Sequence, residues 1–196
     1  MKIQLPTPEG LRAVELRFPT DEEWIDRNRR QKLITKQISR TVTEDTIVET
    51  PETDLLLVEK LREVHEGPPL STGEASWILD QLSSAEVEEV ERQGAQFRIV
   101  LRVPGGLVTH IVGMPSVEDM QDFQREFTST RQIQEGRLVK QEQVVNLAAV
   151  KKLYQKLSRG TEGYGMAVPV VHQLPVVLEV MREVRRPISE NGTGNF

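Results

Sequence analysis

Histidine is the side chain in this sequence best suited to acid–base chemistry, and the chain holds three of them, His65, His110 and His172. They stand far apart in the sequence, and none has a second ligand at the spacing of a helical metal site. His172 lies in the most apolar segment and is the histidine that we would test as a catalytic group. The alternative, which we favour, is a hydrogen-bonded histidine of the core or of a helix start.

Tyr164 is the second candidate, because it stands between two glycines and beside the apolar run that contains His172. A glycine-flanked tyrosine at such a place could cover a pocket, as mobile loops over binding sites do. The plainer interpretation is a loop that leads into a buried strand. Trp77 is the third candidate, and we place a hypothetical pocket among these three side chains, between the two halves of the chain.

The familiar catalytic signatures are otherwise missing from the sequence. Without cysteine there are no disulfides, zinc-thiolate sites or thiol nucleophiles. Neither a phosphate-binding loop, a dinucleotide fingerprint nor a serine elbow occurs. Carboxylate pairs that meet only in three dimensions stay open. The sequence therefore predicts no catalytic residue, no cofactor and no metal, and it favours a protein that is not an enzyme.

The composition is that of an ordinary globular protein, with 37% hydrophobic and 28% charged residues. A net charge of −5 and a pI near 5.4 argue against nucleic acid or an anionic membrane as a partner. No apolar run approaches the ~20 residues of a membrane span. Because the first residues carry no apolar secretion signal, we expect an acidic cytoplasmic protein.

The chain contains an internal repeat. When residues 1–61 are laid over residues 97–157, a shift of 96 positions without a gap, 13 of the 61 pairs are identical. About 4 identities would be expected by chance for chains of ordinary composition. The identical pairs are Ile3/Ile99, Leu5/Leu101, Pro8/Pro104, Gly10/Gly106, Leu11/Leu107, Pro19/Pro115, Glu22/Glu118, Asp26/Asp122, Arg29/Arg125, Val48/Val144, Leu57/Leu153, Lys60/Lys156 and Leu61/Leu157.

The matched residues fall where turns, helix caps and apolar helix faces are expected. Pro8–Gly10 and Pro104–Gly106 predict β-hairpin turns, and Thr20 and Ser116 predict helix N-caps with an acidic residue three positions later. We therefore predict an α+β fold built by tandem duplication of a β-hairpin-plus-helices unit, with two pseudo-symmetric subdomains. The predicted units are residues 1–94, with a Pro-containing linker near 67–69, and residues 95–187, before a flexible tail at 188–196.

Beyond the hairpins, the pattern predicts further elements along both units. A capping box at Ser71–Glu74 marks one helix start. Glycine-rich residues near Tyr164 predict a loop, and the apolar run after it a buried strand. The predicted helices cover about 20–36, from Pro51 on, from Ser71 on, about 83–92 and about 175–185, and the predicted strands include 41–48 and 166–171.

Three functions are compatible with these features. The first is a non-enzymatic structural, assembly or interaction protein, such as a component or chaperone of a phage or phage-like particle, with protein partners or self-association through hairpin edges. The second is a small-ligand-binding module or small enzyme with its site between the two units. The third, least favoured, is a nucleic-acid accessory protein that uses the basic residues from Arg27 to Arg40.

Overall fold

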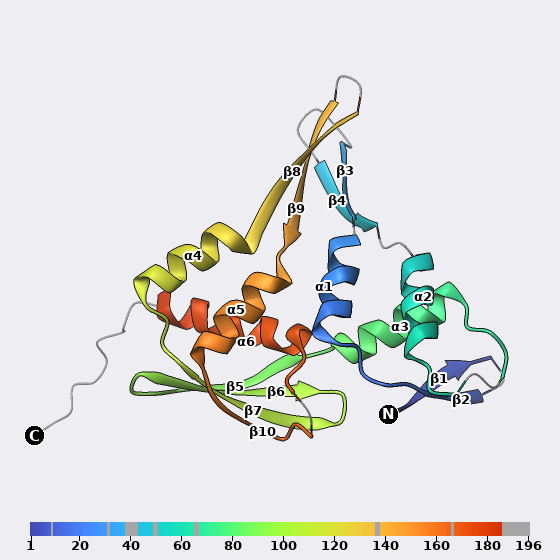
Figure 1. Cartoon of the computed structure of the whole chain (residues 1–196), viewed down its shortest axis with the longest axis horizontal. Coiled ribbons are helices and arrows are strands. Elements are labelled where there is room, and N and C mark those ends of the chain that lie inside the picture. Colours follow the sequence, from blue (N-terminus) through green and yellow to red (C-terminus); the bar gives the residue numbers. More distant parts are fainter. Residues whose placement is uncertain are drawn as a thin grey trace, which may run out of the picture.

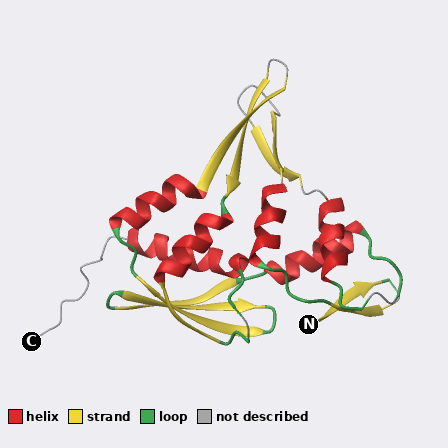
Figure 2. Ribbon diagram, in the orientation of Figure 1, coloured by secondary structure: helices red, strands yellow, loops and turns green. Residues whose placement is uncertain are grey.

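The computed structural model describes residues 1–8, 10–30, 32–37, 43–48, 51–64, 67–135, 138–165 and 167–185. It confirms the α+β class (Figure 2). The helices are α1 (Asp21–Arg30), α2 (Pro51–Leu61), α3 (Thr72–Ser83), α4 (Val117–Phe127), α5 (Leu147–Leu157) and α6 (Val170–Arg185). The strands are β1 (Lys2–Thr7), β2 (Gly10–Glu15), β3 (Lys32–Gln37), β4 (Thr43–Val48), β5 (Glu86–Gln93), β6 (Gln96–Val103), β7 (Gly106–Gly113), β8 (Thr128–Glu135), β9 (Leu138–Val145) and β10 (Ser158–Glu162).

The helices form a central layer with strands on two sides of it (Figure 1). A four-stranded antiparallel sheet, in the order β10-β7-β6-β5, lies below α5 and α6, and the β1–β2 hairpin lies below α3. Two β-ribbons, β3–β4 and β8–β9, rise from the other side of the helices and lean together, with β3 beside β9. The fold thus has a packed base and a narrow projection.

The larger hydrophobic core lies between the four-stranded sheet and the helices above it. Every second residue of β6 faces this core, and Phe97, Ile99 and Leu101 are fully buried there. Val150 of α5 and Val176 of α6 close it from above. This alternation in β6 explains why the segment is a strand with one face on the helices.

The smaller core joins the β1–β2 hairpin to α1, α2 and α3, around Trp24 and Leu61. The predicted capping box at the start of α3 is present, with Ser71 and Glu74 each accepting from the other's backbone N–H. Two residues far along the chain, Leu147 and Val170, are buried in this core as well. The two halves therefore share a core at their junction.

Elements of the two halves recur in the same order at the predicted shift. Helices α1 and α4 begin at residues 21 and 117, and α2 and α5 begin at 51 and 147, each pair 96 positions apart. The single bridge between Leu16 and Arg62 has its counterpart between Val112 and Ser158, where β10 joins β7. That a tandem duplication gave rise to this order stays a prediction. The boundary between the two units at residues 94–95 also stays a prediction. Strand β5, which lies before that boundary, pairs with β6 after it.

Three predicted elements were wrong. The helix expected over 20–36 ends at Arg30, because the β-branched run that follows forms β3 and pairs with β4. The helix expected over 83–92 is strand β5: its glutamates favour a helix, but Val87 and Val90 pack on the core when the segment pairs with β6. The strand expected over 166–171 was wrong, since the described residues 167–169 form no strand and α6 begins at Val170. The predicted tail at 188–196 and His65 lie outside the described residues.

Candidate functional site

Two of the three candidate residues meet in the structure, and the third does not join them. The hydroxyl oxygen of Tyr164 lies 3.4 Å from Nδ1 of His172. Trp77 lies on α3 instead, half-buried against the smaller core. The pocket expected among all three side chains stays a prediction.

Tyr164 and His172 belong to a longer row of hydrogen-bonded side chains that also contains His110 of β7 and Tyr154 of α5. Nδ1 of His110 lies 2.8 Å from the Tyr154 hydroxyl, and its Nε2 lies 3.3 Å from the Tyr164 hydroxyl. At the far end, Nε2 of His172 lies 3.1 Å from the backbone oxygen of Leu82. We call Tyr154, His110, Tyr164 and His172 the His–Tyr chain.

The carbonyl of Leu82 fixes the direction of every hydrogen bond in the chain. A carbonyl only accepts, so Nε2 of His172 carries the proton and its Nδ1 accepts from the Tyr164 hydroxyl. The Tyr164 oxygen then accepts from Nε2–H of His110. Nδ1 of His110 is left as an acceptor for the Tyr154 hydroxyl. All four side chains are neutral and satisfied in this arrangement.

Burial favours these neutral forms. It lowers the pKa of His110 to about 4, with a smaller lowering from the charge of His172. Burial also lowers the pKa of His172, partly opposed by its hydrogen bond to Leu82. The pKa values of Tyr154 and Tyr164 are both raised by burial. At neutral pH the chain therefore carries no charge.

Two members of the chain, His110 and Tyr154, have apolar counterparts in the first half. Val14 and Val58, both buried, occupy the positions that correspond to His110 and Tyr154. The first half has a different buried polar group, in which Arg27 binds Asp54 through two hydrogen bonds of 2.8 and 2.9 Å. Ser76 donates to the same carboxylate at 3.0 Å. Each half thus specifies its core with its own polar contacts.

Arg27 was also the first residue of the basic segment considered for nucleic acid. Its guanidinium is committed to Asp54, and its side chain is only 10% exposed. It also stands 5.8 Å from the centre of the Trp24 ring. Since the side chains of residues 29–50 lie outside the described part of the structure, Arg27 is the one basic residue of that segment that can be assessed, and its side chain is largely buried against Asp54.

A cavity of about 310 Å³ lies next to the His–Tyr chain, between the start of α1 and the segment before α6. Phe18 lines it from one side and Pro169 from the other. The Phe18 ring also packs edge-on against His172, with ring centres 5.9 Å apart. This cavity lies between the two halves, where the sequence placed a ligand site.

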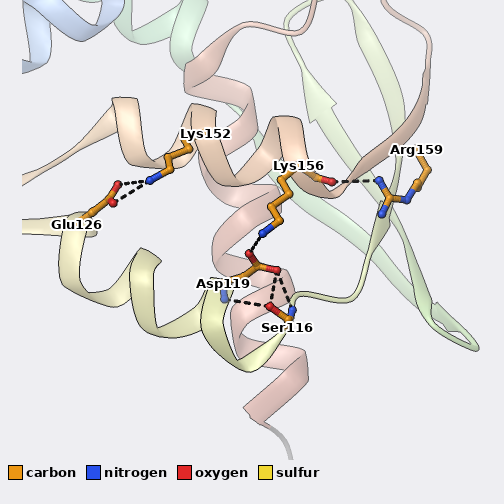
Figure 3. Close-up of polar contacts among 6 residues, drawn as sticks. All are labelled: Ser116, Asp119, Glu126, Lys152, Lys156 and Arg159. Carbon is orange, nitrogen blue, oxygen red and sulfur yellow. Dashed lines mark hydrogen bonds and ion pairs between the residues drawn. The ribbon is translucent and has the colours of Figure 1, made fainter.

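A second kind of cavity lies between the first two helices of each half. In the second half, Asp119 of α4 accepts from Ser116, the N-cap residue, and binds Lys156 of α5 (Figure 3). One turn before Lys156 on α5, Lys152 binds Glu126 of α4 at 2.9 Å. The groove between these pairs has an apolar floor and a cavity of about 70 Å³, lined by Asp119, Asp122, Phe123, Glu126, Ala149, Lys152, Leu153 and Lys156.

The first half repeats this groove. Glu23 caps α1 together with Thr20 and binds Lys60 of α2 at 2.7 Å. Its cavity of about 190 Å³ is lined by Glu23, Asp26, Arg27, Thr53, Leu56, Leu57 and Lys60, each 96 positions before a residue that lines the other groove. The identical lysines thus make corresponding helix-to-helix ion pairs in both halves.

No family model, curated protein or solved structure matches this chain. Among the described residues, no group of three histidines and carboxylates is placed to hold a metal ion. No helix in the same part of the chain is both long and apolar enough to cross a membrane.

The sequence identified only part of this site. It singled out Tyr164 and His172 but assigned no partner to either. His110 could have been found, because it stands at an inward position of a strand whose alternate residues, Val108 and Val112, are apolar. Tyr154 lies on the buried face of α5, 44 residues from His110, and no local spacing joins the two.

Proposed function

We propose that this protein is a non-enzymatic structural or interaction protein that assembles through its two β-ribbons. The observation that carries the proposal is the projection of β3–β4 and β8–β9 from the helical layer (Figure 1). Side chains that could do chemistry are instead buried and mutually satisfied in the His–Tyr chain. A projecting ribbon beside a well-packed base suits contact with a partner better than catalysis.

The backbone of the ribbons supports a pairing role. Strand β4 pairs with β3 from Thr43 to Val48, and β8 pairs with β9 from Thr128 to Glu135. Because β3 and β9 lie side by side, β4 and β8 are the outer strands of the described projection. Outer strands offer a row of backbone donors and acceptors to which another strand can add.

We also propose where the protein assembles, in a phage or phage-like particle, and this part of the proposal rests on the sequence alone. A cytoplasmic protein that joins two similar units in one chain suits the structural components and assembly chaperones of phage or phage-like particles. A pseudo-symmetric monomer can fit two equivalent positions of a symmetric assembly. The expected partner is a protein, either another molecule of this chain or a different particle component.

Light scattering behind size exclusion, over a hundredfold range of concentration, tests the proposal. We expect a discrete oligomer or growth with concentration. A variant in which residues 33–47 and 129–144 are replaced by short glycine-containing turns should stay monomeric and keep its helical circular dichroism. Variants that lose one ribbon at a time are the matched controls and should show intermediate association.

A strict monomer of 22.3 kDa at every concentration, in wild type and shortened variant alike, would contradict self-assembly. It would favour the alternative, a ligand-binding module. The observation behind that alternative is the cavity of about 310 Å³ beside His172. Substitutions Tyr164→Phe and His172→Asn should then abolish a ligand-induced rise in Tm, found by thermal-shift screening, and leave any association unchanged.

A further inference from the structure

We propose that the His–Tyr chain is an acid-sensitive latch that holds the described residues 163–165 and 167–169 in place, keeps them in place after one proton binds, and releases them when a second proton binds. The segment connects β10 to α6, and Tyr164 is its attachment to both histidines. The inference concerns regulation of the cavity between the two halves and does not depend on the assembly function.

Charged groups on the elements around the chain either bind other residues or, like Arg159 and Glu162 of β10, are exposed to solvent, and no ion pair among the described residues joins one of them to an imidazole of the chain. Asp21 of α1 binds Lys151 of α5 at 2.9 Å. In α3, Asp80 lies 3.9 Å from Arg27. The ion pairs of α6 and β6 are Glu179–Arg182, Arg98–Glu89 and Arg102–Glu88. Protonation is therefore governed by burial and by the hydrogen bonds of the chain itself.

The chain can take up one proton from solvent without losing a hydrogen bond. A proton added to the Tyr154 oxygen displaces the hydroxyl proton to Nδ1 of His110. The Nε2 proton of His110 moves to the Tyr164 oxygen, and the Tyr164 proton moves to Nδ1 of His172. One imidazolium, that of His172, results. The three hydrogen bonds within the chain are retained in the opposite direction, and the bond from His172 to Leu82 is unchanged. The Tyr154 hydroxyl turns to Ser158, whose side chain already hydrogen-bonds it.

A second proton cannot be accommodated in this way. It must bind Nε2 of His110, so that both imidazoles present N–H groups to the Tyr164 oxygen. The Tyr164 hydroxyl then has no acceptor within the chain, and two positive rings flank it at 5.5 and 6.1 Å between ring centres. The lowering of the His110 pKa by the charge of His172 has the sign that this coupling requires.

Release of Tyr164 would act on the neighbouring cavity. Ala167 and Pro169, in the same segment, line the cavity of about 310 Å³ opposite Phe18. When the Tyr164 hydroxyl loses its hydrogen bonds to His110 and His172, the residues around it are still joined to β10 and α6 by the backbone. They no longer have the hydrogen bonds of the Tyr164 side chain, which hold them between these two elements. The cavity therefore widens in acid on the side of Ala167 and Pro169, opposite Phe18.

Two measurements on the full chain test the latch between pH 2.5 and 7. NMR of the imidazole nitrogens should show two separate protonation steps shared by His110 and His172. Hydrogen exchange of the backbone amides of residues 163–165, 167 and 168, corrected for intrinsic rates, should lose protection at the second step only. Strand β6 should keep its protection there. Simultaneous loss in β6 would mean global acid unfolding and would overturn the proposal.

Two variants separate the latch from a general effect of burial. Tyr164→Phe keeps the ring but removes the bridging hydroxyl, so the histidines should titrate as independent single sites and the segment should exchange fast at every pH. Tyr154→Phe removes a hydroxyl at the end of the chain and leaves Tyr164 bridged. It should still show release at the second protonation. Identical titrations in wild type and Tyr164→Phe would refute the coupling.

Discussion

Asp21 caps a helix that begins 149 residues later in the chain: its carboxylate accepts a hydrogen bond of 2.9 Å from the backbone N–H of Val170, the first residue of α6. The same carboxylate binds Lys151 of α5 at 2.9 Å. An acidic side chain at a helix N-terminus satisfies an unpaired donor and suits the helix dipole. One residue of the first half therefore joins two helices of the second.

Removal of this carboxylate should weaken the junction. We expect Asp21→Ala to lower the free energy of unfolding, measured in urea, by about 1–2 kcal/mol, since a helix cap and a charged hydrogen bond are lost together. Glu22→Gln is the matched control, because its side chain is 80% exposed and lies further from Lys151, at 3.5 Å. Equal losses in the two variants would show that the contact to Val170 contributes nothing.

Removing only one partner of the Arg27–Asp54 ion pair should lower the free energy of unfolding. Arg27→Phe leaves a carboxylate that is only 4% exposed without its cation, and we expect a loss of about 3–5 kcal/mol. The second half has Phe123 and Val150 at these positions. The double variant Arg27→Phe/Asp54→Val should therefore recover much of the loss in a denaturant titration. A double variant as unstable as the sum of the single ones would contradict this.

Stability should fall in acid because of His110. Its pKa is lowered from 6.5 to about 4 by burial, so the unfolded chain binds more protons between these values. The contribution of neutral His110 to the free energy of unfolding is present in full above pH 6.5. It is lost as the pH falls towards 4, which lowers that free energy by about 3 kcal/mol. Urea titrations at successive pH values measure it. The free energy of unfolding should depend less steeply on pH in His110→Gln than in the wild type. An unchanged dependence on pH would assign the acid sensitivity to other groups.

The backbone at Gly163 should tolerate no side chain. Its φ of +91° is unfavourable for other residues, and a Cβ would lie 2.8 Å from the Leu107 oxygen. Gly163→Ala should lower Tm, with a cost of about 1–3 kcal/mol in stability, and should speed hydrogen exchange around Tyr164. Gly165→Ala meets no atom within 4 Å and is the control. Similar Tm values for both variants would count against a strained site.

Local signals in the sequence predicted much of the fold. The capping residues Thr20, Ser71 and Ser116 mark helix starts because one side chain and one nearby N–H suffice to make a cap. Strand β5 was missed because its partner lies in β6 and glutamate-rich segments are typical of helices. The site was harder still, since Tyr154 and His110 meet only after α5 packs on β7.

Leu147 and Val170 of the second half are buried in the smaller core, whose other buried residues come from the first half. A core that draws side chains from both halves cannot be completed by either half alone. Despite its repeated order of elements, we therefore expect the molecule to unfold as a single cooperative unit, with one thermal transition instead of two. Expressing residues 1–94 alone would yield a chain whose core is open at the places of these two residues.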